Sequence, residues 1–142
     1  MAFSTFAASL LLAGTAQALD NGFGRTPVMG FNTYNDVGCS PNQSYVQTTI
    51  NSFSNKGFGA LGYKYFQVDC GWQGYQRQSN GSITYDAGVF PDGIAPLSKL
   101  AISKGFQWSM YTDQGQYSCD TKTPLRPGSL NYEKQDALMF AA

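Results

Sequence analysis

The sequence predicts an α/β fold in which parallel strands alternate with helices. Apolar segments of strand length recur three times, and the stretches between them carry apolar residues at helical spacing. No two-residue hairpin turn joins one strand to the next, which argues against antiparallel neighbours. The order of strand, helix, strand, helix, strand and helix is typical of a parallel sheet with helices packed outside it.

The three predicted strands are apolar over nearly their whole length, as expected for strands buried on both faces. The first covers Pro27 to Asn32, the second Tyr63 to Cys70, and the third Phe106 to Asp113. Polar residues at the end of each segment mark where the strand gives way to a loop.

A helix is predicted between the first two strands. Its apolar residues fall at positions i, i+4 and i+7 and are Val46, Ile50 and Phe53. Ser40 or Asn42 is positioned to cap the start of this helix, and Gly57 is positioned to end it.

Two further helices are predicted. Between the second and third strands, Leu97, Leu100 and Ala101 share one helical face, and Gly105 marks the stop. The last helix is expected to begin near Ser129, and the printed sequence ends within it.

A (β/α) barrel and an open doubly wound sheet both fit this order. The sequence has no Gly-x-Gly-x-x-Gly after the first strand and no Walker-type motif, so the barrel is favoured over nucleotide-binding sheets. A closed barrel needs eight parallel strands and about 250 residues. We therefore interpret the 142 residues as the first three βα units of a truncated (β/α)8 TIM barrel.

The composition excludes several classes of partner and chemistry. Nine basic and nine acidic residues give a net charge of zero, so neither nucleic acid nor a membrane surface is an expected partner. The sequence contains no histidine, which removes Ser-His-Asp chemistry and leaves carboxylates as candidate catalysts. No residue pattern demands a metal or a cofactor.

The N-terminus predicts secretion. Residues 1–18 contain an apolar run and then Ala16-Gln17-Ala18, the small-x-small pattern of a signal peptide cleavage site. The run is too short to span a membrane. Two N-x-Ser triplets, at Asn42 and Asn80, fit passage through a glycosylating secretory route.

Three cysteines are an odd number for an oxidising compartment. Cys39 and Cys70 follow adjacent strands, so a disulfide between them would join the first two βα loops. For Cys119 the alternatives are a reactive free thiol, an intermolecular bridge, or a partner beyond Ala142.

Polar and aromatic residues gather at the carboxyl ends of the strands, where parallel α/β enzymes build their active sites. Carboxylates, amides and aromatic rings together suit a sugar, whose hydroxyls accept and donate hydrogen bonds and whose C–H faces stack on rings. These residues are Asn32, Tyr34, Asn35 and Asp36 after the first strand, Asp69, Cys70 and Trp72 after the second, and Tyr111, Asp113 and Cys119 after the third.

Asp69 and Asp113 are the pair that glycoside hydrolysis by two carboxylates would suggest. The alternative is that each binds substrate hydroxyls without reacting, or caps the loop that follows it. Substrate binding or a structural polar role is favoured for Asp69, and a structural role for Asp113.

The aromatic residues divide by position. Trp108 lies inside the third strand and is interpreted as core, whereas Trp72 follows a strand end and is a candidate for lining a pocket. Tyr34 and Tyr111 stay open between pocket and packing.

Four segments carry a family resemblance: "LDNGFGRTPVMGFNTYNDVGC", "LGYKYFQVDCGWQ", "FPDGIAPLSKLAISKGFQWSMYTDQGQYSC" and "RPGSLNYEKQDALMFAA". From Leu19 to Ala142 the chain resembles the N-terminal part of the secreted α-galactosidases of glycoside hydrolase family 27, the melibiase group. This resemblance implies a retaining hydrolase that removes terminal α-linked galactose from melibiose, raffinose-type oligosaccharides and galactomannans. It also implies a (β/α)8 barrel followed by a β-sandwich domain.

The resemblance assigns roles to individual residues. Asp69 matches a carboxylate that hydrogen-bonds galactose hydroxyls, Tyr34 stands where the family usually has a sugar-contacting Trp, and Tyr111 and Trp72 match an active-site Tyr and Trp. The nucleophile and the acid/base Asp are expected beyond Ala142, so the fragment alone is predicted to be inactive.

The resemblance also implies that Cys39 pairs with Cys70, and Cys119 with a cysteine beyond the printed chain. Two departures concern the sugar site: "MGFNTY" replaces Met-Gly-Trp-Asn-Ser-Trp, and "VDCGW" replaces Asp-Asp-Cys-Trp, so that Val68 stands where a second carboxylate is common. The alternatives to an α-galactosidase are a non-catalytic galactose-binding module and a barrel glycosidase of other sugar specificity. The oligomeric state is left open.

Overall fold

A computed structural model describes residues 21–22, 24–120 and 123–141, so the predicted signal peptide lies outside the described residues. The strands β1 (Gly30–Asn32), β2 (Tyr65–Val68) and β3 (Gln107–Met110) form one parallel sheet in the order β1, β2, β3. Phe31 stands opposite Phe66, and Phe66 opposite Trp108. The predicted parallel order is therefore confirmed.

Each observed strand is shorter than the predicted segment that contains it. The ladder between β1 and β2 begins at Gly30, where the carbonyl of Met29 accepts hydrogen bonds from the N–H groups of Lys64 and Tyr65. At the carboxyl end of β2, the N–H of Asp69 donates to the hydroxyl of Thr33 and no longer to a backbone carbonyl of β1.

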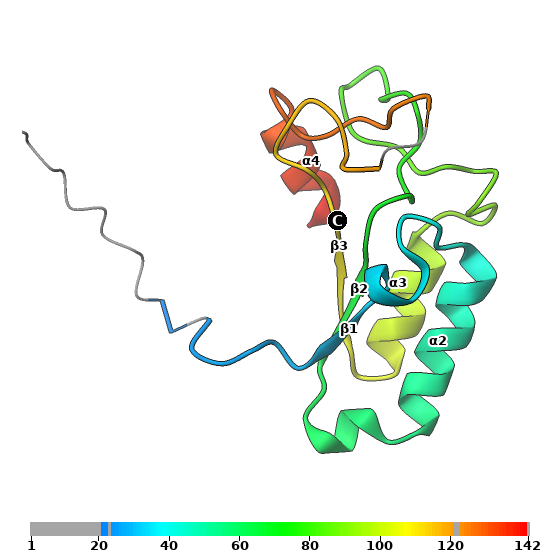
Figure 1. The fold of residues 1–142 in the computed structure, drawn as a ribbon, viewed down its shortest axis with the longest axis vertical. Helices are drawn as coiled ribbons and strands as arrows, with labels where there is room; N and C mark the ends of the chain where they lie inside the picture. The colour runs from blue at the N-terminus through cyan, green and yellow to red at the C-terminus, as the bar shows by residue number, and fades with distance from the viewer. Residues whose placement is uncertain (1–20, 23, 121–122, 142) are drawn as a thin grey trace, which may run out of the picture.

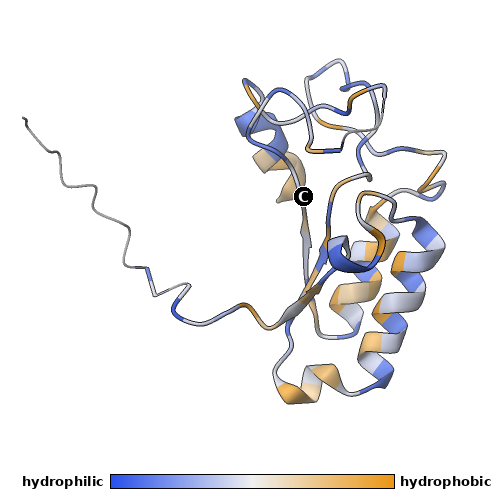
Figure 2. Cartoon of the chain, viewed as in Figure 1, coloured by the Kyte–Doolittle hydropathy of each residue, from blue (hydrophilic) through white to orange (hydrophobic). Residues whose placement is uncertain are grey.

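Two long helices cover one side of the sheet. Figure 1 shows α2 (Gln43–Asn55) and α3 (Ala95–Ser103) together on one side of the strands, with α4 (Glu133–Phe140) on the other side. Polar residues of α2 lie on its outer side in Figure 2. The loops that follow the strands gather at one end of the molecule, beyond the carboxyl ends of the sheet.

The predicted boundaries of α2 hold. Asn42, not Ser40, is the N-cap residue, and its side chain accepts a hydrogen bond of 2.9 Å from the N–H of Tyr45. At the other end, Gly57 has a φ of 77°, the left-handed conformation that a helix commonly adopts just past its last turn. The short helix η1 (Phe58–Leu61) follows and leads into β2.

The last helix begins later than predicted. Ser129 was expected near its start, but α4 begins at Glu133. The N–H of Ser129 donates to the carbonyl of Asp113, and the N–H of Leu130 donates to Gly115, so both residues are bound to the loop after β3. Asn131 then has a φ of 67°, which no helix interior adopts.

The core lies between the sheet and the pair α2 and α3. Trp108 is partly buried and stacks on Phe66 with an interplanar angle of 6°, in agreement with its predicted place in the core. Trp72, the other tryptophan, is only 1% exposed. The fully or nearly buried apolar residues are Val46, Ile50, Phe53, Phe66, Val68, Cys70, Trp72, Ile83, Phe90, Leu97, Ala101 and Phe106.

Among the described residues, no helix combines the length and the apolar character needed to cross a bilayer.

Candidate functional site

Asp69 is held at the carboxyl end of β2 by three hydrogen bonds. Its carboxylate accepts one from the side-chain amide of Asn32 and one from the N–H of Cys70, each 2.8 Å long. Its own N–H donates to the hydroxyl of Thr33 at 3.0 Å, and Thr33 is completely buried. The half-buried carboxylate therefore has a fixed orientation and still reaches solvent.

Tyr34 is brought beside this carboxylate by the same asparagine. The side-chain oxygen of Asn32 accepts the N–H of Tyr34 at 2.8 Å, at the start of the short helix α1 (Tyr34–Val37). Asp36 on this helix accepts a 2.7 Å hydrogen bond from the hydroxyl of Tyr45, which fastens α1 to α2. The ring of Tyr34 is 51% exposed, so it is available to a ligand at the rim.

Tyr111 follows β3 and is held by hydrogen bonds both at its backbone N–H and at its hydroxyl. Its N–H donates to the carbonyl of Val68, and its hydroxyl donates to the carboxylate of Asp113 at 3.0 Å while accepting the N–H of Cys119 at 3.1 Å. Burial, and then hydrogen bonding with Cys119 and Asp113, raises the pKa of the Tyr111 phenol well above its usual value. Tyr111 is therefore a neutral phenol at any physiological pH.

Asp113 is occupied by this local structure. Besides the hydroxyl of Tyr111, its carboxylate accepts the N–H of Gly115 at 2.6 Å. This is the structural role predicted for it, because the carboxylate closes the first turn of the loop after β3.

Trp72 lies under the rim. Its indole N–H donates to the carbonyl of Tyr111 at 2.8 Å, and the ring packs edge-on to Phe140. Met110, Met139 and the Trp72 ring line part of a cavity of about 600 Å³. Trp72 supports Tyr111 from below, and direct contact between this indole and a sugar stays a prediction.

Val68 stands where the family resemblance implies a second carboxylate. Its side chain is completely buried in the apolar core, as expected for an aliphatic residue that ends a strand. Asp69 is therefore the only carboxylate that "VDCGW" supplies at the end of β2.

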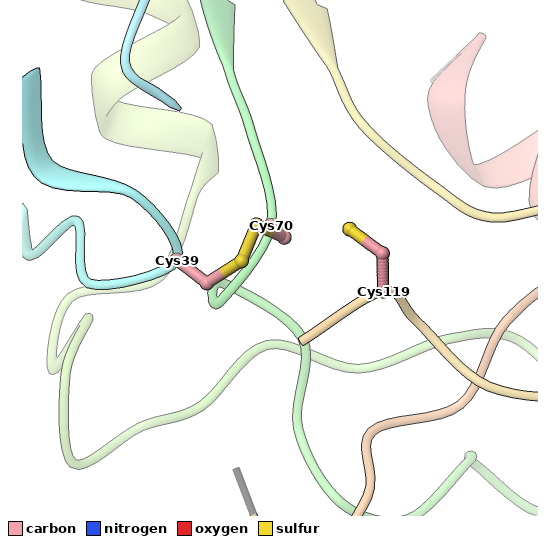
Figure 3. Close-up of side chains that lie close together, drawn as sticks. All are labelled: Cys39, Cys70 and Cys119. Atoms are coloured by element: carbon pink, nitrogen blue, oxygen red, sulfur yellow. A yellow bond between two sulfur atoms is a disulfide. The ribbon is translucent and has the colours of Figure 1, made fainter. Parts of the chain in front are cut away.

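Cys39 and Cys70 form a disulfide that joins the loop after β1 to the loop after β2 (Figure 3). Gly71, next in the chain, has a φ of 94°, and a Cβ atom there would overlap the carbonyl group of Cys39. Glycine is therefore required where the two loops meet. The "VDCGW" glycine thus has a structural explanation.

Cys119 reaches the same place from the loop after β3. Its thiol is free and exposed, and the three sulfur atoms lie within 4.8 Å of one another (Figure 3). Across the described ranges, this is the group of cysteine and acidic side chains that comes close enough to share a metal ion. The disulfide uses two of the three sulfurs, which leaves one thiol and no metal-binding set.

A buried ion pair behind the rim was not anticipated from the sequence. Arg77, in the loop after β2, donates to both carboxylate oxygens of Asp136 on α4, and the Asp136 side chain is 2% exposed. Burial by itself would raise the pKa of Asp136, but the hydrogen bonds and charge of Arg77, with the hydroxyl of Ser129, lower it below its usual value. The partners are 59 residues apart, so no local pattern marks them.

A second arginine joins the loop after β3 to the loop after β2. Arg126 is 5% exposed, donates to the carboxylates of Asp86 and Asp120, and also donates to the carbonyl of Gln73. Arg77 also donates to the carbonyl of Gly128 at 2.6 Å, so both arginines fasten the loop that carries Asp69 to the loop that carries Tyr111.

Comparison with known proteins agrees with this geometry. Residues 30–142 match the family model described as Alpha galactosidase A. A probable alpha-galactosidase D from Aspergillus oryzae is 41% identical over 124 residues, which cover 87% of this chain and 19% of that protein.

Two solved structures are similar in fold. Alpha-galactosidase I from Mortierella vinacea has a TM-score of 0.77 at 32% identity, covering 87% of this chain and 30% of that one. An alpha-galactosidase from Saccharomyces cerevisiae, solved with raffinose, has a TM-score of 0.75 at 33% identity, covering 85% and 26%. Together with the parallel sheet, this likeness confirms the predicted first three βα units of a (β/α)8 barrel. The chain spans less than a third of the length of each of these relatives.

Proposed function

The chain belongs to the alpha-galactosidase A family, and from this membership we propose that the complete protein containing it hydrolyses terminal α-linked galactose from galactosides. The substrate class is galactose-bearing oligosaccharides and polysaccharides, including melibiose, raffinose-type sugars and galactomannans. A relative of similar fold has been solved with raffinose, which supports this class.

The part of the reaction assigned to this chain is binding the sugar. The observation that carries the proposal is the fixed carboxylate of Asp69, which accepts hydrogen bonds from Asn32 and Cys70 and keeps lone pairs for galactose hydroxyls. Tyr34 adds an exposed ring for a C–H face, and Tyr111 a neutral phenol. These groups orient the galactose for carboxylates that act on its glycosidic bond.

The 142-residue chain alone is proposed to be inactive. Retaining glycoside hydrolysis needs a nucleophilic carboxylate and an acid/base carboxylate about 5–5.5 Å apart. By the family resemblance neither group lies in this chain. Asp113 is no substitute, because its carboxylate holds Tyr111 and Gly115.

The test is an assay of the complete gene product on an aryl α-galactoside, with the β-anomer as a control. Hydrolysis of the α-anomer alone is expected, and no hydrolysis of it would refute the proposal. Asp69→Asn should lower kcat/KM by about 10- to 100-fold, since a charged acceptor for sugar hydroxyls is lost. The matched control is Asp92→Asn, an exposed carboxylate that accepts the side-chain amide of Gln43 on α2 and should leave kcat/KM unchanged.

The burial of Val68 bears on which sugar the protein prefers. Val68 is buried where a second carboxylate is common, so the grip on galactose depends more heavily on Asp69. A barrel glycosidase of other sugar specificity is the second candidate. Profiling aryl α-glycosides of galactose, N-acetylgalactosamine, glucose and mannose distinguishes the two, and a preference for any sugar other than galactose would select the second candidate.

Secretion is part of the proposal. Residues 1–18 are proposed as a cleaved signal peptide and Asn42 and Asn80 as glycosylation sites. Both asparagines are exposed, and the carbonyl oxygen of each side chain accepts a backbone hydrogen bond while the amide nitrogen that would carry the glycan is left available. N-terminal sequencing and glycosidase-treated mass spectra of the secreted product test these three assignments.

A further inference from the structure

A groove of about 480 Å³ lies between the loop after β2 and the loop after β3, away from Asp69. Its lining includes three tyrosines and three residues with side-chain amides. We call it the tyrosine groove, and these residues are Tyr75, Tyr117, Tyr132, Gln76, Gln116 and Asn131.

All three tyrosines are exposed to solvent. Tyr75 is 42% exposed, Tyr117 48% and Tyr132 39%. Rings exposed together on one groove present a surface for stacking, because their apolar faces are not covered by the core.

Two of the rings are held in position by the buried arginines. The guanidinium carbon of Arg126 lies 4.4 Å from the centre of the Tyr75 ring, and that of Arg77 lies 4.2 Å from the centre of the Tyr132 ring. Arg126 also donates to the hydroxyl of Tyr75 at 3.1 Å. A guanidinium over one face of a ring restricts the orientation of that ring, so less order has to be gained when a ligand binds.

The groove carries no net charge of its own. Arg77 is the charged residue of its lining, and the charge of Arg77 is matched by Asp136. The remaining polar groups facing the groove are neutral amides, which donate to and accept from hydroxyls. A neutral ligand rich in hydroxyls and with apolar C–H faces fits this lining better than a nucleotide, a phosphopeptide or an anionic lipid.

We propose that the tyrosine groove is an accessory carbohydrate site that binds sugar units of a polysaccharide at a distance from its terminal galactose. Gln116 and Tyr117 belong to the loop whose first turn is closed by Asp113, the partner of Tyr111, so the groove and the galactose-binding rim share one segment. This inference rests on the proposed function, because it takes the polysaccharide as the substrate.

Kinetics of the complete protein test the groove. Tyr117→Ala removes a ring that contacts neither buried arginine, and should raise the KM for galactomannan about three- to tenfold while leaving kcat/KM for an aryl α-galactoside unchanged. Tyr117→Phe keeps the ring and should behave as wild type. Ile102→Ala is the control, since Ile102 is 60% exposed on α3 and lies outside this groove and outside the cavity beside Trp72.

A binding measurement separates this inference from the proposed function. Native gels cast with galactomannan, compared with gels cast without it, should retard the wild-type protein, Tyr117→Phe and Ile102→Ala, but retard Tyr117→Ala less. Equal retardation and equal KM for wild type and Tyr117→Ala, with circular dichroism confirming that the variant is folded, would overturn the groove while hydrolysis of the aryl galactoside stands. If Tyr117→Phe were also retarded less than wild type, stacking of the sugar on the ring of residue 117 would be refuted. Absent hydrolysis with preserved retardation would instead refute the proposed function.

Discussion

Arg77 and the buried Asp136 form a bidentate ion pair that joins the loop after β2 to α4, with hydrogen bonds of 2.6 and 2.8 Å. Asp136 also accepts the hydroxyl of Ser129 at 2.7 Å, and Ser129 shares a 2.7 Å hydrogen bond with Thr112, the residue after Tyr111. The pair therefore stabilises the segment that follows β3, and its loss should disturb the position of Tyr111.

Asp136→Asn should destabilise the protein by about 3–5 kcal/mol, because it leaves the Arg77 guanidinium, whose side chain is 12% exposed, without its counter-charge. Urea unfolding of wild type and variant measures the difference. Glu133→Gln, on the exposed side of the same helix, should cost less than about 0.5 kcal/mol. Equal effects of the two substitutions would show that the pair contributes nothing beyond its helix.

The same carboxylate should make stability depend on acid. The pKa of Asp136 is lower in the folded protein than in the unfolded chain, so the folded state is favoured by its ionised form above about pH 4. This contribution is lost as the pH falls through the folded pKa. Wild type should lose stability between pH 5 and pH 2 more steeply than Asp136→Asn, measured as urea midpoints across about three pH units. Parallel curves would contradict this assignment.

Asn32→Ala should lower kcat/KM of the complete protein on an aryl α-galactoside about tenfold with little effect on stability. Asn32 is exposed, but it holds both the carboxylate of Asp69 and the N–H of Tyr34. Asn35→Ala, on the exposed surface of α1, is the control and should retain full activity. An equal loss in both variants would mean that Asn32 does not position the carboxylate.

Gly71→Ala should destabilise by about 3 kcal/mol or more, since the added methyl group must displace the Cys39 carbonyl as well as adopt a φ of 94°. Gly57→Ala isolates the second cost: its φ is 77° and nothing lies within 4 Å of the new atom, so about 1–2 kcal/mol is expected. Thermal and urea unfolding compare them. A smaller effect at Gly71 than at Gly57 would contradict the close approach of the two loops.

Cys119 should be the one cysteine of the 142-residue chain that iodoacetamide labels without reductant, because its thiol is exposed and the other two are bonded. Left unblocked at alkaline pH, its thiolate should attack the nearby disulfide, forming a bond to Cys70 or Cys39 and releasing the other as a thiolate. Peptide mapping after acid quenching detects the new pair. Cys119→Ser should keep the Cys39–Cys70 pair at every pH, and an unchanged map in the unblocked wild type would show that the thiol cannot reach it.

The order of strands and helices could be predicted from the sequence because it depends on local periodicity. Val46, Ile50 and Phe53 repeat at helical spacing whatever surrounds them, and they are the buried residues of α2. The end of each strand was also visible, which is why Asp69, Tyr34 and Tyr111 could be assigned to one rim. The pairing of Cys39 with Cys70 was available for a different reason, the resemblance to a family.

Tertiary contacts decided four features of the structure. These are the start of α4, the burial of Trp72, the support given by Asn32 and the two arginine-centred networks. Ser129 carries an acceptable start signal for a helix, yet Ser129 and Leu130 are hydrogen-bonded back to the start of their own loop and Asn131 has a φ of 67°, so the helix begins at Glu133. Arg77 and Asp136 are ordinary charged residues until folding brings them together across 59 positions and removes water from both. Periodicity is a property of neighbours along the chain, whereas hydrogen bonds and desolvation between distant segments exist only once the sheet has placed its loops at one edge.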